Sequence, residues 1–163
     1  MKRLLIVWHS RTGAARAMAE AAAGSARDEA EVEIRLMAAD TAGPDDLLAA
    51  DGYLFAAPEN LAALSGEMKA FFDRSYYPVL ERLNGRPYAM MIAAGSDGTA
   101  AARQLARIAT GWRLKAVAEP IIVCTHAQTP DAILAPKVLS PPDLLRCREL
   151  GAALAAGLAM GVF

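Results

Sequence analysis

The chain opens with a short apolar run, residues 4–8, that leads directly into a turn of hydroxyl-bearing residues and then into an alanine-rich segment. This order predicts a buried strand, a tight turn and a helix that begins near Thr12. A helix N-terminus presents N–H groups without partners and the positive end of the helix dipole. Ser10, Thr12 and Gly13 at such a terminus are suited to bind a phosphate. Because Ser and Thr also cap helices that bind nothing, the rest of the chain must distinguish these two interpretations.

Strand and helix patterns alternate along the whole chain. Further strands are predicted at residues 31–36, 52–56, 88–93 and 120–124, and helices at residues 12–26, 44–48, 65–76, 99–109 and from Pro142 or Asp143 onward. We expect Pro58 to stop the third strand and Pro78 to kink or restart a helix. Short connections between these elements require a parallel sheet covered on both faces. We therefore expect one α/β domain, residues 1–163, built as a three-layer α/β/α sandwich around a five-stranded parallel sheet in the order 2-1-3-4-5.

Composition limits the possible partners. Of the 163 residues, 55% are hydrophobic and 21% are charged, which is enough for one large core, and the net charge is -1. Such a chain has no broad electrostatic field that attracts nucleic acid or an acidic membrane. The two cysteines, Cys124 and Cys147, show no metal-ligand spacing and are expected to be free buried thiols. The opening residues lack a signal-peptide core, so we expect a cytoplasmic protein.

The C-terminal stretch, residues 150–163, contains no charged residue. It is shorter than the ~20 residues that cross a bilayer, so we do not expect a membrane span. An exposed apolar terminus would be a sticky patch unless a second subunit covered it. We therefore expect a homo-oligomer that forms through an apolar C-terminal helix.

Three loops rich in small residues meet at the expected ligand crevice. In a doubly wound sheet this crevice lies beyond the carboxyl ends of the strands, where the winding reverses. The loops at residues 9–15, 58–66 and 94–98 reach this point and allow a planar ligand to approach the backbone. A further irregular segment, residues 125–142, carries four prolines and also leaves the carboxyl end of a strand. It either lies over the crevice or forms a stiff surface loop, and the sequence supports both interpretations.

These segments resemble the flavodoxin-like superfamily, and in particular its FMN-dependent NAD(P)H reductases. The turn at residues 10–15 is similar to that family's phosphate loop. The stretch 57–60 is similar to its proline-led flavin loop, and residues 65–74 are similar to its K-x-x-x-D-R helix. With residues 85–87 and 95–98, the resemblance extends over roughly residues 3–125. It implies a flavodoxin-like fold, bound FMN, and NADPH or NADH as a transient electron donor.

The resemblance also implies roles for individual residues. The first turn would hold the FMN phosphate through hydroxyls and backbone N–H groups, with added charge from Arg11 or Arg16. The other two loops would bracket the isoalloxazine ring with backbone amides. The implied cofactor-binding residues are Ser10, Arg11, Thr12, Gly13, Ala14, Ala15, Pro58, Glu59, Asn60, Leu61, Ala94, Gly95, Ser96 and Gly98. The flavin carries the redox chemistry itself, so no catalytic side chain and no metal site is expected.

Two features depart from the family pattern. Residues 60–64 offer no Tyr or Trp to stack on the flavin. The missing stack is worth ~0.5–1.5 kcal/mol and would leave one face of the ring open to a substrate. Ala15 stands where a hydroxyl is common, which removes a phosphate contact worth ~1.5–3 kcal/mol.

Several smaller candidates have simpler structural explanations. We expect His9 to face solvent at the end of a strand, with contact to the phosphate or the flavin rim as the alternative. His126 could reach a substrate from the long irregular segment. Trp8 and Trp112 are expected to be packing residues. The Asp-Arg pair at residues 73–74 is expected to orient its helix or to pair across a subunit boundary.

Three functions remain open from the sequence. The first is an FMN-dependent oxidoreductase in which NADPH or NADH reduces the flavin and a quinone-like or other small molecule accepts the electrons. The second is a flavodoxin-type electron carrier, which the net charge of -1 disfavours because such carriers use strong charge to steer toward their partners. The third is a flavodoxin-like binding module that has lost FMN. The first is our prediction.

Overall fold

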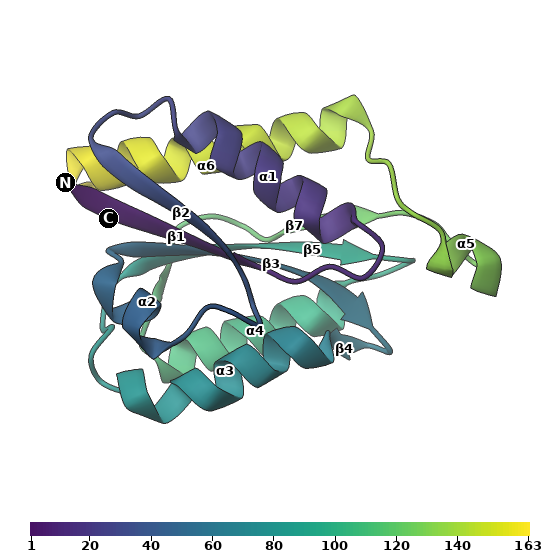
Figure 1. The fold of residues 1–163 in the computed structure, drawn as a ribbon, viewed down its shortest axis with the longest axis horizontal. Coiled ribbons are helices and arrows are strands. Elements are labelled where there is room, and N and C mark those ends of the chain that lie inside the picture. Colours follow the sequence, from purple (N-terminus) through teal and green to yellow (C-terminus); the bar gives the residue numbers. More distant parts are fainter.

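Residues 1–163 are all described by a computed structural model, in which a parallel sheet lies between two layers of helices (Figure 1). The strands are β1 (Lys2–Trp8), β2 (Val32–Ala38), β3 (Gly52–Asn60), β4 (Ala63–Leu64), β5 (Pro87–Ala94), β6 (Lys115–Ala116) and β7 (Ile121–Cys124). The helices are α1 (Ala14–Ala26), α2 (Pro44–Ala49), α3 (Gly66–Val79), α4 (Thr99–Gly111), α5 (Pro130–Leu134) and α6 (Pro141–Met160).

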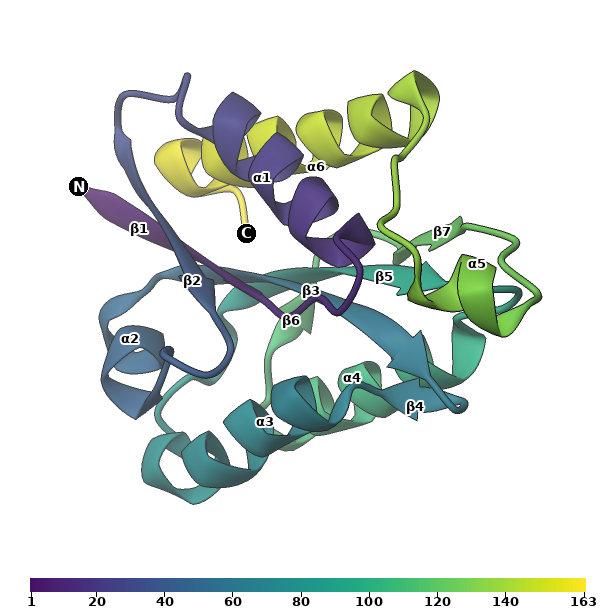
Figure 2. The same ribbon diagram turned by 45° about the vertical axis from the view of Figure 1, so that its right-hand side comes forward.

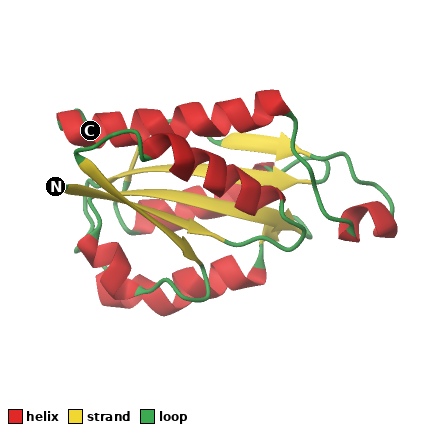
Figure 3. Cartoon of the chain, turned by 45° about the horizontal axis from the view of Figure 1, so that its top comes forward, coloured by secondary structure: helices red, strands yellow, loops and turns green.

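The sheet has the strand order β2-β1-β3-β5, and β6 and β7 both continue it beside β5. These pairings are all parallel, whereas β4 pairs antiparallel with the end of β3. Helices α1 and α6 cover one face, and α2, α3 and α4 cover the other (Figure 1 and Figure 3). The predicted sandwich and its winding order are therefore confirmed.

The structure contains seven strands where five were predicted. Strands β6 and β7 share the last position in the sheet. The break between them ends at Pro120, which has no N–H to donate to a neighbouring strand. The additional strand β4 forms a hairpin with β3, which continues past Pro58 to Asn60 instead of stopping. The carbonyl oxygen of Pro58 accepts the N–H of Ser65 at 3.2 Å, which starts the hairpin. Helix α3 likewise runs through Pro78 without a restart, because that residue lies in its last turn.

Helices α1 and α6 pack closely because small residues lie between them. Gly151 of α6 lies against the backbone of α1, where a Cβ atom would be 2.1 Å from the Ala22 carbonyl oxygen. The opposite layer is built from large residues instead, with Phe72 in contact with both Phe55 and Trp112. The close α1–α6 contact holds the first turn of α1 over the carboxyl end of the sheet (Figure 2).

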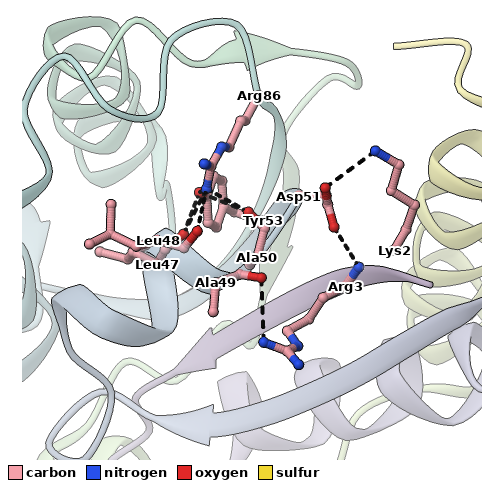
Figure 4. A network of polar contacts seen from close by, with 9 residues as sticks. All are labelled: Lys2, Arg3, Leu47, Leu48, Ala49, Ala50, Asp51, Tyr53 and Arg86. Carbon is pink, nitrogen blue, oxygen red and sulfur yellow. Dashed lines mark hydrogen bonds and ion pairs between the residues drawn. The ribbon is translucent and has the colours of Figure 1, made fainter.

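The amino-terminal end of the sheet is held by Arg86 (Figure 4). Its guanidinium group donates hydrogen bonds to carbonyl groups at the end of α2, where a helix leaves its last carbonyls without helical partners. The Nη1 atom lies 2.6–3.1 Å from the carbonyl oxygens of Leu47, Leu48 and Ala50 and from the Tyr53 hydroxyl. Burial raises the pKa of Tyr53 to about 12, and the nearby guanidinium acts in the opposite direction. This network joins α2 to the start of β3 and to the loop before β5.

The uncharged C-terminal stretch forms the second half of α6 and a short tail. Leu154 and Leu158 face the core, whereas Met160 and Val162 are exposed. No helix of the protein combines the length and the apolar character that a membrane crossing requires.

Candidate functional site

A cleft of about 630 Å³ opens at the carboxyl ends of β1, β3 and β5, where the three predicted loops meet. In a doubly wound sheet, small molecules and cofactors bind at this position. Most of the predicted residues line it, namely Ser10, Arg11, Thr12, Ala14, Ala15, Pro58, Glu59, Asn60, Ala94 and Gly95. Loops that are far apart in the sequence thus form one site.

Four predicted residues do not line the cleft. Gly13 sets the conformation of the first turn. Its φ is +102°, and its N–H donates to the Ser10 hydroxyl at 3.0 Å. Gly98 is enclosed, since a Cβ atom there would lie 2.6 Å from a neighbouring side chain. Leu61 and Ser96 are exposed, and Leu61 forms the tip of the β3–β4 hairpin. These four residues therefore belong to the loops but do not form the cleft surface.

The N-terminus of α1 opens into the cleft with donors that the protein itself does not use. Ala17 donates the first helical hydrogen bond, so the N–H groups of residues 14–16 have no acceptor within the helix. No loop carbonyl accepts them, and the first turn of α1 contains no acidic residue. Ala14 and Ala15 are only 5% and 1% exposed, because they pack into the core beneath this turn. Unpaired N–H groups beside the Thr12 hydroxyl, at the positive end of a helix, favour an anion.

The N-terminus of α4 lies at the same end of the sheet but is already occupied. The Glu59 carboxylate accepts the N–H of Gly98 and the N–H of Ala101, both at 3.0 Å. A carboxylate in this position satisfies the orphan donors and the helix dipole together. Unlike the N-terminus of α1, this helix end is therefore not open to a ligand anion.

The turn between β3 and β4 is strained. Leu61 and Ala62 have positive φ values of 50° and 60°, as in a two-residue type I′ hairpin, where Asn and Gly are the usual residues. The hairpin is attached to α4, because the Leu64 N–H donates to the Gln104 amide oxygen at 2.7 Å. Backbone strain of this kind persists at functional sites where the surrounding structure enforces it. Here it holds Asn60 in the wall of the cleft.

His9 is engaged with α3, so the prediction that it faces solvent is wrong. Its Nδ1 lies 2.8 Å from the Ser65 hydroxyl and its Nε2 lies 3.5 Å from the Glu67 carboxylate. These three residue types also occur in hydrolase triads, but Ser65 is fully buried and no substrate can reach its oxygen. The contact instead joins the first loop to the N-terminus of α3. His126 is exposed and does not line the cleft, although its N–H donates to the Gly95 carbonyl.

The expected packing residues have the roles predicted for them. Trp112 is fully buried, and its indole N–H donates to the Tyr76 carbonyl at 3.1 Å. The Arg16 guanidinium lies 5.3 Å from the centre of the Trp8 ring, outside the cleft. Arg74 donates to two carbonyl groups in the loop after β2, which orients α3 as expected.

The segment that follows β7 contributes all but one of the cleft residues that were not predicted, the other being Ala93 of β5. Thr125, Ala127, Ile133, Leu134 and Lys137 all line the cleft. The sequence did indicate this segment as a possible cover for the crevice, through its prolines and its position after a strand. It gave no signal for the short helix α5 or for the individual residues that face the ligand space.

Comparisons with known proteins agree with this geometry. The family model described as NADPH-dependent FMN reductase matches residues 40–129. A flavodoxin of Aquifex aeolicus is 33% identical over 60% of this chain and 53% of its own length. An NAD(P)H dehydrogenase (quinone) of Acidithiobacillus ferrooxidans is 30% identical over 46% of this chain and 48% of its own length. The chain thus spans about half the length of these curated relatives. The crystal structure of flavodoxin 1 from Bacillus cereus has the same fold, with a TM-score of 0.78, 22% identity, and coverage of 96% of this chain and 99% of that one.

Proposed function

This chain belongs to the NADPH-dependent FMN reductase family, and from that premise we propose that it oxidises NADPH or NADH and reduces a quinone-like or other small acceptor through FMN. The observation that carries the proposal is the open N-terminus of α1 in the cleft at the carboxyl ends of the strands. The coarser assignment, an FMN-binding oxidoreductase or electron carrier of flavodoxin-like fold, follows from the family.

The residues of the cleft fit a phosphate at one end and a planar ring at the other. The phosphate would accept the N–H groups of residues 14–16 and the hydroxyl of Thr12, which have no partners in the chain. The Ser10 hydroxyl already accepts the Gly13 N–H, so its own hydrogen remains available to donate outward. Arg11 adds positive charge at the same end of the cleft. The site can therefore hold a dianion through N–H groups, hydroxyls and the positive charge of Arg11.

The ring would lie between the backbone at residues 58–60 and the backbone at residues 94–95. Bound FMN supplies a ring system that accepts a hydride and releases electrons. The chain contributes small or apolar surfaces here, since Pro58 has no N–H and Ala94 has only a methyl group. Glu59 is held by the N-terminus of α4 and is not free to act as an acid or base on a ligand. The protein's part is therefore to bind and orient rather than to transfer protons.

A second candidate is a flavodoxin-type electron carrier. It is favoured by the Aquifex aeolicus flavodoxin, which is 33% identical to this chain. The net charge of -1 argues against it, because a carrier that docks by electrostatic steering needs a stronger field. A flavodoxin-like module without flavin remains the third candidate.

One experiment separates all three functions. We would titrate the purified apo-protein with FMN, follow the flavin fluorescence and absorbance, and then add NADPH or NADH under anaerobic conditions. Saturable binding at micromolar concentration or below, followed by bleaching with either nucleotide, is the expected result. Binding without bleaching would favour the carrier, and a protein that does not bind FMN would be the module without flavin. Addition of a quinone to the bleached protein should restore the yellow colour.

We further propose that a second copy of the chain covers the C-terminal face. A hollow on this face is lined almost entirely by apolar residues, among them Val117, Leu150, Met160, Val162 and Phe163. No charged side chain lies in the stretch from residue 150 to the end. Sedimentation velocity should show a dimer or larger assembly that Met160→Glu dissociates, and a monomer at all concentrations would refute the proposal.

A further inference from the structure

The segment between β7 and α6 crosses the cleft as a strap, defined here as residues 125–139. One end is attached to the loop after β5, because Thr125 and His126 donate their N–H groups to the carbonyls of Ala94 and Gly95, each at 2.8 Å. The other end is attached to the first turn, where the Lys137 N–H donates to the Thr12 carbonyl at 2.8 Å. The strap therefore joins two of the three loops that form the site. In Figure 1 and Figure 2 its helix α5 stands out from the body of the molecule.

The strap presents apolar side chains that no part of the protein covers. None of the residues of α5 is buried. Ile133 and Leu134 are 50% and 68% exposed, yet both line the cleft. Leu139 is the first buried residue after α5 and anchors the strap in the core. Aliphatic side chains that project over a hollow gain free energy only when something apolar fills that hollow.

The strap also brings a positive charge to the phosphate end of the cleft. Lys137 is half-buried and lines the cleft beside Thr12. No carboxylate of the chain pairs with it, and its Nζ donates to the carbonyl oxygens of Ile133 and Ala135 at 2.8 and 2.6 Å. An ammonium group donates three hydrogen bonds, so one donor remains for an anion.

We propose that the strap is a fourth binding element of the site, beside the three loops, in which Lys137 pairs with the cofactor phosphate and Ile133 and Leu134 cover the ring system. This inference rests on the proposed function, because it takes FMN as the ligand. The aliphatic cover supplies the apolar contact that the β3–β4 hairpin lacks, since residues 60–64 contain no aromatic side chain. The strap thus compensates for the departure of the flavin loop from the family pattern.

The two roles are separated by comparing FMN with riboflavin, which has the same ring and no phosphate. Lys137→Met keeps an unbranched side chain that is one atom shorter and removes its charge. We expect it to weaken FMN roughly tenfold to a hundredfold and to leave riboflavin unchanged, because only the phosphate contact is lost. The double substitution Ile133→Ala and Leu134→Ala should weaken both ligands by a similar factor, on the order of tenfold.

Matched controls come from the same chain. Val138 belongs to the strap and is 97% exposed but does not line the cleft, so Val138→Ala should change neither affinity. Lys115→Met removes an exposed lysine from β6, at the other end of the sheet, and should also have no effect. Thermal melting of each variant checks that the fold is intact. As an independent readout, FMN should slow hydrogen exchange of the amides at residues 126–138.

The outcomes distinguish this inference from the proposed function. If the wild-type protein binds neither FMN nor riboflavin, the proposed function fails and the strap inference fails with it. If the wild-type protein binds FMN but the strap variants bind as tightly and the strap amides gain no protection, only the strap inference is refuted. If Lys137→Met lowers the affinities for FMN and for riboflavin equally, then this lysine supports α5 and does not contact the phosphate.

Discussion

At the scale of single residues, Thr12 provides the most direct test of the phosphate site. Thr12→Val removes one hydroxyl and nearly preserves the shape of the side chain. We expect FMN affinity to fall roughly tenfold to a hundredfold, because a charge-assisted hydrogen bond is lost. Thr110→Val is the matched control, since that hydroxyl donates to the Ala106 carbonyl on α4, away from the cleft. Fluorescence titration measures both variants, and equal affinities for Thr12→Val and the wild type would remove Thr12 from the site.

Cys147 gives a prediction about pH at the same scale. Its thiol is fully buried, and burial raises its pKa to about 11 from an ordinary value of 9.0, with Arg146 acting in the opposite direction. Between these values the folded protein keeps a proton that the unfolded chain has lost. The free energy of unfolding should therefore decrease as the pH rises from 9 to 11. Burial also raises the pKa of Tyr53 and Tyr88, which adds to the decrease at higher pH.

Urea denaturation at several pH values tests this effect. Cys147→Ala should reduce the slope between pH 9 and 11, whereas Cys124→Ala serves as the control for loss of a thiol. The same burial predicts that an alkylating reagent at pH 8 modifies Cys124 well before Cys147. Equal rates at the two thiols would contradict the packing of α6 against the core.

At the scale of elements, the β3–β4 hairpin carries strain that a glycine relieves. Ala62 has φ at 60°, a conformation that costs a residue with a Cβ atom about 1 kcal/mol and glycine very little. We expect Ala62→Gly to raise the free energy of unfolding by up to about 1 kcal/mol. Ala63→Gly, one position later in β4, should lower it instead, because glycine weakens a strand. A stabilising effect of both variants would mean that the turn is not strained as described.

The same elements show where sequence reasoning succeeds and where it does not. Buried strands and amphipathic helices have strong periodic signals, so the layers and the winding order were predictable. The hairpin was not, because Leu61-Ala62 is not a turn-forming pair and its conformation is enforced by Glu59 and by Gln104 from α4. Helix α5 was missed because five residues carry no periodic signal and none of them is buried. The pairing of His9 with Ser65 joins residues far apart in the chain, and only the folded structure brings them together.

At the scale of the whole molecule, the contact between α1 and α6 fixes the position of α1, whose first turn lines the cleft. Gly151→Ala would place a Cβ atom against the backbone of α1, which cannot move without displacing its first turn. We expect a loss of about 1–3 kcal/mol in unfolding free energy. Gly24→Ala in α1 meets no atom within 4 Å and should stabilise the protein by about 0.5–1 kcal/mol. Thermal and urea denaturation test both variants, and a neutral Gly151→Ala would show that the contact is looser than described.

The occupation of α4 by Glu59 has a consequence for the time that each nucleotide spends on the protein. The open N-terminus of α1 offers one phosphate position in the cleft, so we expect a mononucleotide with one phosphate to be held in a single direction. A dinucleotide brings a second phosphate, and the N-terminus of α4 is already occupied by Glu59. We therefore expect the residence time of a nicotinamide dinucleotide to be short compared with that of FMN. Such a difference would let one molecule remain as a fixed part of the protein while the other is exchanged at every turnover.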